Sequence, residues 1–154
     1  MNNSLKGTLL VIGQFILLGL LILYPANSIN YGVFGLTVTL AIAILLAMGF
    51  VILGLSFLAL GKSLTAHPIP AKKGELVTDG LYRFARHPIY TGVLSIGLAM
   101  ALSRGLFPHI LFFIALIVLL NYKASFEEQL LRARYVDYAS YADKTGRFLP
   151  KLKR

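Results

Sequence analysis

Two short stretches of this sequence combine residue types that can bind charged groups or move protons. The first, residues 81–92 (LYRFARHPIYTG), places Arg86 and His87 directly before an apolar run. The second places Glu127 and Glu128 directly after the next apolar run. Guanidinium groups hold carboxylates, and imidazole gains or loses a proton near neutral pH. If the two stretches meet, they form an acid–base cluster.

Two interpretations of this cluster stay open from the residue types alone. Long basic side chains also gather where a helix enters a membrane, because they reach the headgroups. Arg83 is interpreted as such an anchor, and Pro88 is explained by a helix start alone. Ionisable groups at the mouth of a helix bundle are expensive in lipid, however, and usually mark function.

The composition indicates an integral membrane protein. Of 154 residues, 57% are hydrophobic and only 14% are charged, and there is no room for two ordinary domains. Cysteine is absent, which excludes disulfides, thiolate zinc sites and a cysteine nucleophile. We predict one all-α domain over residues 1–154 with four transmembrane helices, because four apolar runs contain no charge. These runs are residues 8–24, 33–61, 88–103 and 106–122.

The charges predict how these spans are oriented. With four spans, every lysine and arginine except Arg104 falls on one side of the membrane, and so do all six acids. The positive-inside rule therefore places both termini and the 62–87 connection in the cytoplasm. Only Lys6 precedes the first run, which we interpret as a retained span rather than a signal peptide. The net charge is +9, and the basic side chains on this side then face anionic lipid headgroups. No nucleic-acid partner is therefore expected.

The third and fourth runs should form a hairpin that turns near Gly105. His87 lies 18 residues before this glycine, and Glu127 and Glu128 lie 22 and 23 residues after it. At about 1.5 Å per helical residue, these groups reach the same depth within roughly one to two turns. We therefore expect Arg86 and His87 to face the acidic pair, although adjacent glutamates cannot both point into one pocket.

A cytoplasmic or interfacial helix is predicted over residues 123–145. Glu127, Leu131, Tyr135 and Tyr138 fall on one face of it. This aromatic face can anchor in the interface or fold back as a lid over the bundle. Taken by itself, the pattern favours the anchor.

Two blocks of this sequence resemble a known protein family. Residues 76–92 contain R-H-P-x-Y-x-G, which resembles the signature of the isoprenylcysteine carboxyl methyltransferase-like family, a relative of the phospholipid N-methyltransferases. The tail, FEEQLL followed by aromatics and GRFLP, resembles the second block of its short bacterial members. The resemblance covers residues 60–152. Leu81 replaces a usual proline, and one residue fewer precedes Tyr138, which leaves the roles of Tyr138 and Tyr141 open.

The resemblance implies S-adenosylmethionine as cofactor and a lipophilic acceptor that is a carboxylate, a thiol or an amine. Arginine suits the carboxylate of this donor, glutamate its ammonium and hydroxyls, and tyrosine faces its sulfonium and adenine. Methyl transfer depends mainly on positioning and needs no metal. The implied catalytic residues are Arg86, His87 and Glu128. The implied cofactor-binding residues are His87, Tyr90, Gly92, Gly97, Glu127, Glu128, Tyr135 and Arg147.

The predicted location is the inner membrane of a bacterium, with the site facing the cytoplasm. A long second run and short third and fourth runs favour a groove open to the bilayer and a lipid substrate. Two other functions stay open: a non-catalytic module that binds lipid or partner helices, and an NADPH-dependent enzyme similar to sterol reductases. A Rossmann-type methyltransferase is excluded by pattern, since no G-x-G-x-x-G follows a strand.

Overall fold

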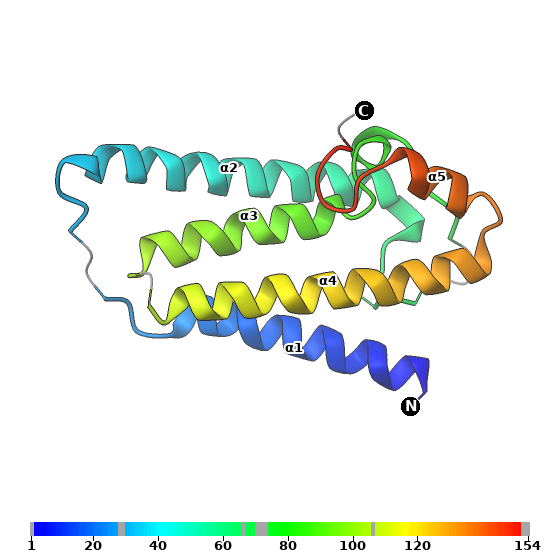
Figure 1. The fold of residues 1–154 in the computed structure, drawn as a ribbon, viewed down its shortest axis with the longest axis horizontal. Helices are drawn as coiled ribbons and strands as arrows, with labels where there is room; N and C mark the ends of the chain where they lie inside the picture. The colour runs from blue at the N-terminus through cyan, green and yellow to red at the C-terminus, as the bar shows by residue number, and fades with distance from the viewer. Residues whose placement is uncertain (1, 28–29, 66, 70–73, 106, 152–154) are drawn as a thin grey trace.

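A computed structural model describes residues 2–27, 30–65, 67–69, 74–105 and 107–151. These residues form helices and no named strand, which confirms the all-α prediction. Figure 1 shows the long helices side by side, with a short helix folded against one end of the bundle. The helices are α1 (Asn3–Leu23), α2 (Gly35–Leu60), α3 (Pro88–Ser103), α4 (His109–Arg134) and α5 (Tyr138–Lys144), with the 3-10 turns η1 (Gly32–Phe34), η2 (Gly61–Ser63) and η3 (Gly80–Arg83).

The long helices overlap the four predicted apolar runs, but α1 begins before its run, at Asn3, and α4 continues beyond its run, to Arg134. Within the described residues, α1, α2 and α4 are long and apolar enough to cross a membrane, and α3 is a shorter apolar helix of 16 residues. Outward-facing side chains such as Leu23 and Leu58 are each 80% exposed, as expected for surfaces in contact with lipid. The number of spans and the orientation of the termini stay predictions.

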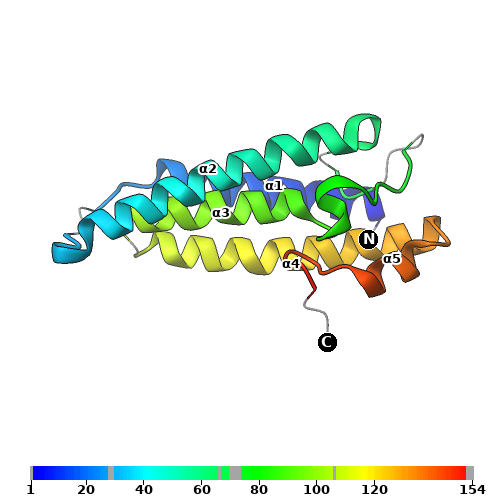
Figure 2. The ribbon, with the colours of Figure 1, turned by 90° about the horizontal axis from the view of Figure 1, so that it is seen from above.

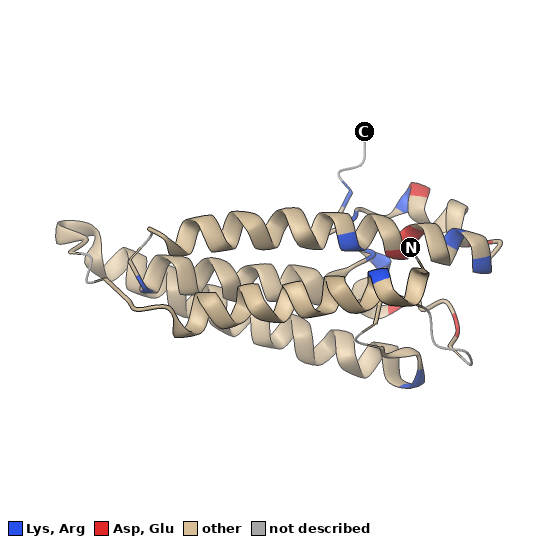
Figure 3. Cartoon of the chain, turned by 90° about the horizontal axis from the view of Figure 1, so that it is seen from below, with Lys and Arg blue, Asp and Glu red and all other residues tan. Residues whose placement is uncertain are grey.

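The charged residues gather at one end of the bundle. Figure 3 shows most of them at the end that holds the N-terminus and α5. Arg104, by contrast, caps the opposite end of α3. This is the asymmetry on which the predicted orientation depends. Part of that prediction lies outside the described residues, namely Lys72, Lys73, Lys153, Arg154 and the first residue of the fourth run, Leu106.

Glycines bring α3 close to both of its large neighbours. A Cβ atom on Gly92 would lie 2.9 Å from the Gly49 carbonyl oxygen of α2. A Cβ atom on Gly97 would lie 3.2 Å from the Phe113 ring of α4. Small residues allow such close helix approach in membranes. Gly92 and Gly97, predicted as cofactor contacts, thus lie in helix–helix contacts.

The α2–α3 contact yields a test of the packing. We expect Gly49→Val to lower the free energy of unfolding by about 1–3 kcal/mol, because its Cβ would lie 2.6 Å from Ile96. Gly54→Val on the same helix is the matched control, since nothing lies within 4 Å of its added Cβ. Thermal unfolding in detergent, followed by circular dichroism, measures both. Equal destabilisation by the two variants would contradict this packing.

The C-terminal region differs from the single predicted helix over 123–145. Helix α4 continues to Arg134, the chain is extended at Tyr135, and α5 begins at Tyr138. Val136 and Asp137, between the two helices, are weak helix formers. Figure 2 shows the chain turning back after α5 along the end of α4. Tyr138 is only 1% exposed, so the anchor interpretation is wrong and the tail folds back over the bundle.

Candidate functional site

Backbone pairing fixes the start of α3 against the C-terminal tail. Ala85 and Gly146 form an isolated parallel bridge. The backbone N–H of Arg86 donates to the Gly146 carbonyl at 2.9 Å, and that of His87 donates to the Arg147 carbonyl at 3.0 Å. Residues 60 positions apart in the sequence thus place their side chains in one cluster.

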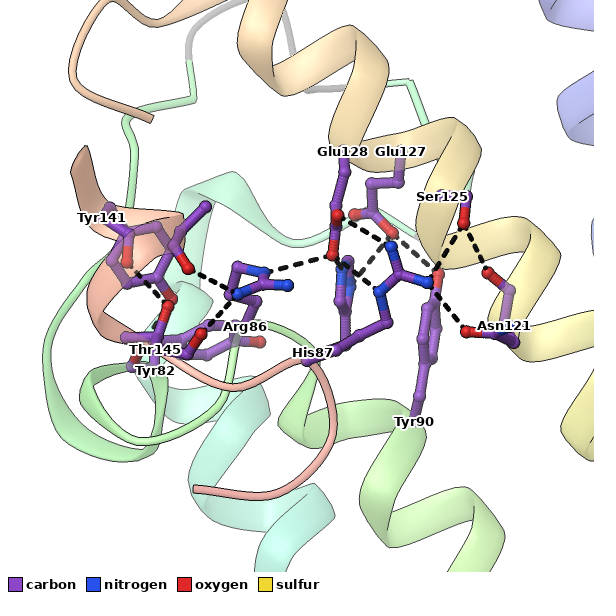
Figure 4. A network of polar contacts seen from close by, with 12 residues as sticks. Tyr82, Arg86, His87, Tyr90, Asn121, Ser125, Glu127, Glu128, Tyr141 and Thr145 are labelled. Atoms are coloured by element: carbon purple, nitrogen blue, oxygen red, sulfur yellow. Dashed lines mark hydrogen bonds and ion pairs between the residues drawn. The ribbon is translucent and has the colours of Figure 1, made fainter. Parts of the chain in front are cut away.

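Glu128 is the centre of that cluster. Its side chain is 8% exposed, and its Oε1 accepts hydrogen bonds from Arg86 Nε and Arg147 Nε, each at 3.1 Å. The same oxygen lies 3.2 Å from His87 Nε2, and Oε2 accepts from Arg147 Nη2 at 3.0 Å. Figure 4 shows the labelled Arg86 and His87 directed at Glu128. The expected meeting of Arg86 and His87 with the acidic pair is confirmed.

The two arginines extend the cluster into the tail and into α4. Arg86 Nη1 donates to the backbone carbonyls of Ala142, at 2.8 Å, and Thr145. Arg147 Nη1 donates to Asn121 Oδ1 at 2.8 Å. Buried charges of this kind need several partners to offset their lost hydration. Glu128 therefore joins the tail, α3 and α4 into one unit.

Glu127 points a different way from its neighbour. Its Oε2 accepts a hydrogen bond from Tyr90 at 2.8 Å and lies 3.6 Å from His87 Nδ1. The His87 ring stacks on the Tyr90 ring at a centroid distance of 5.2 Å. The Glu127 side chain is 27% exposed, and its Oε1 has no hydrogen-bond partner among the described residues. Glu127, not Glu128, presents a free carboxylate oxygen.

Glu127 lines a pocket of about 440 Å³. Ligand pockets for small molecules span roughly 300–1,000 Å³. One side of this pocket is polar and carries Arg86, His87, Tyr90 and Glu127. The other side is apolar and comes from three helices, with Val11, Phe15 and Leu18 of α1, Leu53 and Phe57 of α2, and Val93 of α3. The pocket thus joins a charged end to hydrocarbon walls.

A buried lysine, Lys123, also lines the pocket and was not predicted from the sequence. Lys123 is 3% exposed, its Nζ donates to Gln14 Oε1 at 2.7 Å, and it lies 5.2 Å from the Tyr90 ring centroid. Two sequence signals were present. Gln14 is an amide within an apolar run, and Lys123 precedes Glu127 by four residues, on the same helical face.

Besides Tyr90, the pocket is lined by Tyr82 of η3 and by the tail residues Tyr135, Tyr138 and Tyr141. Tyr135 donates to the Gly74 carbonyl and Tyr141 to the Tyr82 carbonyl, each at 2.7 Å. Burial raises the pKa of Tyr141 to about 12, so its hydroxyl stays protonated and holds this bond at neutral pH. These bonds tie the tail to the connection between α2 and α3.

The structure divides the predicted site residues into three groups. Those that line the pocket are Arg86, His87, Tyr90, Glu127 and Tyr135. Those in the cluster behind it are Glu128 and Arg147. Those in helix contacts are Gly92 and Gly97. The roles of all of them towards a ligand stay predictions.

Known proteins share this region of the chain. The family model described as phospholipid methyltransferase matches residues 36–137, which include Arg86, His87, Glu127 and Glu128. The cobalt-zinc-cadmium resistance protein CzcN of Cupriavidus metallidurans is 34% identical over 116 residues. That alignment covers 71% of this chain and 50% of CzcN, so the chain spans about half the length of this curated relative.

Proposed function

Because the chain belongs to the phospholipid methyltransferase family, we propose that it transfers a methyl group from S-adenosylmethionine to a lipophilic acceptor. The single observation that carries this proposal is the pocket, whose charged end adjoins apolar walls. A methyl donor with charged groups fits the first part, and a hydrocarbon chain fits the second. By the positive-inside rule, the charged end faces the cytoplasm of a bacterial cell.

The residues present fit this donor. Its ammonium and ribose hydroxyls need an acceptor oxygen, and Glu127 Oε1 has no partner among the described residues. Its adenine and sulfonium suit aromatic faces, which the five tyrosines that line the pocket supply. The buried Tyr138 hydroxyl has no hydrogen-bond partner in the described structure, as expected for a group that a ligand satisfies.

The side chains of this protein act mainly by position. When bound, S-adenosylmethionine supplies an electrophilic methyl group: the sulfur–methyl bond breaks as the acceptor's oxygen, nitrogen or sulfur forms the new bond. Glu127 and the tyrosines fix one reactant, while the apolar walls hold the other and exclude water. For an amine or thiol acceptor, His87 is placed to receive the released proton, because its ring lies against Glu127 at the pocket wall. A carboxylate acceptor releases none.

The acceptor is expected to carry a hydrocarbon chain. Residues of both α1 and α2 line the pocket, although α1 packs mainly against α4 and α2 mainly against α3. Both helices present exposed apolar residues to lipid, including Phe15 and Leu58. A chain of a membrane lipid can occupy the apolar side while its reactive end meets the polar one.

Ligand binding tests the proposed function. We expect S-adenosylhomocysteine, the demethylated product, to stabilise the purified protein in detergent by about 2.7 kcal/mol at 100 times its dissociation constant. NADPH should give no shift in the same thermal assay. Stabilisation by NADPH alone would support a reductase. If neither S-adenosylmethionine nor S-adenosylhomocysteine stabilises a folded sample, the proposal is excluded. Methyl transfer to a lipid extract, read by mass spectrometry, then identifies the acceptor.

A further inference from the structure

Tyr138 lines the pocket with a buried hydroxyl that has no hydrogen-bond partner among the described residues. The residue is 1% exposed. The hydroxyls of Tyr90, Tyr135 and Tyr141 each donate to a neighbouring oxygen. A buried polar group that stays unpaired is costly, and each such group needs an explanation. A bound ligand at this end of the pocket supplies one.

The surroundings of Tyr138 define what such a ligand presents. Burial, together with the charge of Glu128, raises the pKa of the Tyr138 hydroxyl, so it stays protonated and acts as a donor. Arg86 lies beneath α5, where its Nη1 donates to the Ala142 carbonyl. Its Nη2 has no hydrogen-bond partner in the described part of the chain, and Arg86 also lines the pocket. A neutral donor and a guanidinium edge that line one pocket together suit a carboxylate.

We propose that Tyr138 and Arg86 bind the carboxylate at the amino-acid end of the methyl donor. This inference rests on the proposed function. It moves the carboxylate away from Arg147, which sequence reasoning offered for it. Arg147 is occupied by Glu128 and Asn121 and does not line the pocket. Glu127 then remains free for the ammonium or the ribose hydroxyls.

Calorimetry with two product analogues tests the assignment. S-adenosylhomocysteine carries the carboxylate, and methylthioadenosine keeps the nucleoside and thioether but lacks the amino-acid end. We expect Tyr138→Phe to weaken the binding of S-adenosylhomocysteine about tenfold and to leave the affinity for methylthioadenosine unchanged. The ligand-free variant should unfold at the same temperature as wild type or higher, because it loses only an unpaired hydroxyl. Tyr122→Phe, at a ring that is 53% exposed, is the matched control.

Each other result overturns the inference. If Tyr138→Phe leaves the affinity for S-adenosylhomocysteine unchanged, Tyr138 does not contact the donor. If the affinities for both compounds fall equally, the Tyr138 hydroxyl contacts the nucleoside instead of the carboxylate. If the affinity for S-adenosylhomocysteine is unchanged but the KM for the acceptor rises, Tyr138 and Arg86 bind a carboxylate of the acceptor instead. If wild type binds neither compound, the proposed function itself fails, and this inference fails with it.

A second measurement does not depend on the variant's folding. On wild type, an S-adenosylhomocysteine amide, in which a carboxamide replaces the carboxylate, should bind about tenfold more weakly than the acid. Where Tyr138→Phe folds, this preference should shrink, since a double-mutant cycle reports contact between the two changed groups. Equal binding of acid and amide to wild type overturns the assignment.

Discussion

Glu128→Ala is expected to lower the free energy of unfolding by about 3–5 kcal/mol, the usual effect of removing one partner from a buried charge cluster. Arg86, His87 and Arg147 all lie within 3.2 Å of the Glu128 carboxylate. Without it, two guanidinium groups remain in a largely buried site with no counter-charge in contact. The tail then loses its attachment to α3 and α4, so donor binding should fall as well.

Two measurements distinguish this result from general damage. Chemical unfolding in detergent gives the stability change, and limited proteolysis after Arg134 should become faster as the tail loosens. Glu128→Gln keeps the shape without the charge and should give an intermediate loss. Asp143→Asn removes an exposed carboxylate from α5 and should change neither measurement. If Glu128→Ala unfolds like wild type, the cluster does not hold the tail.

The meeting of these residues could be predicted because helices are rigid and regular. A rise of about 1.5 Å per residue makes the distance along a helix readable from the sequence. Counting outward from Gly105 therefore predicts that His87 lies at nearly the same depth as Glu127 and Glu128, without any knowledge of packing. The uncharged runs likewise fixed the helical class, since lipid leaves few other structures for an exposed backbone.

The direction in which each side chain points depends on tertiary contacts, and counting residues along a helix does not reveal these contacts. Adjacent residues on an α-helix point about 100° apart, so the choice between Glu127 and Glu128 required the path of the tail. That path depends on the break after Arg134 and on the bridge between Ala85 and Gly146. Lys123 was missed for a related reason, since its partner Gln14 is 109 residues away on α1.

Glu127→Gln is expected to reduce methyl transfer roughly 100-fold in kcat/KM, which corresponds to about 2.7 kcal/mol. The physical reason is that Glu127 lines the pocket with an Oε1 that has no partner among the described residues, and an amide cannot supply its charge to a cationic group of the donor. Stability should change far less than in Glu128→Ala. The side chain is 27% exposed, and the amide oxygen can still accept from Tyr90. Kinetics on the identified acceptor and calorimetry with S-adenosylhomocysteine measure the two effects.

The contrast between adjacent glutamates makes this prediction specific. Asp79→Asn removes an exposed acid from the same end of the bundle and serves as the charge control. A Tyr90→Phe, Glu127→Gln cycle should give a coupling energy of about 0.5–3 kcal/mol, because the two groups are hydrogen-bonded. If Glu127→Gln keeps full activity, the free oxygen is not used by the ligand. If it instead unfolds like Glu128→Ala, both acids are structural and the donor must be held by the tyrosines and Arg86.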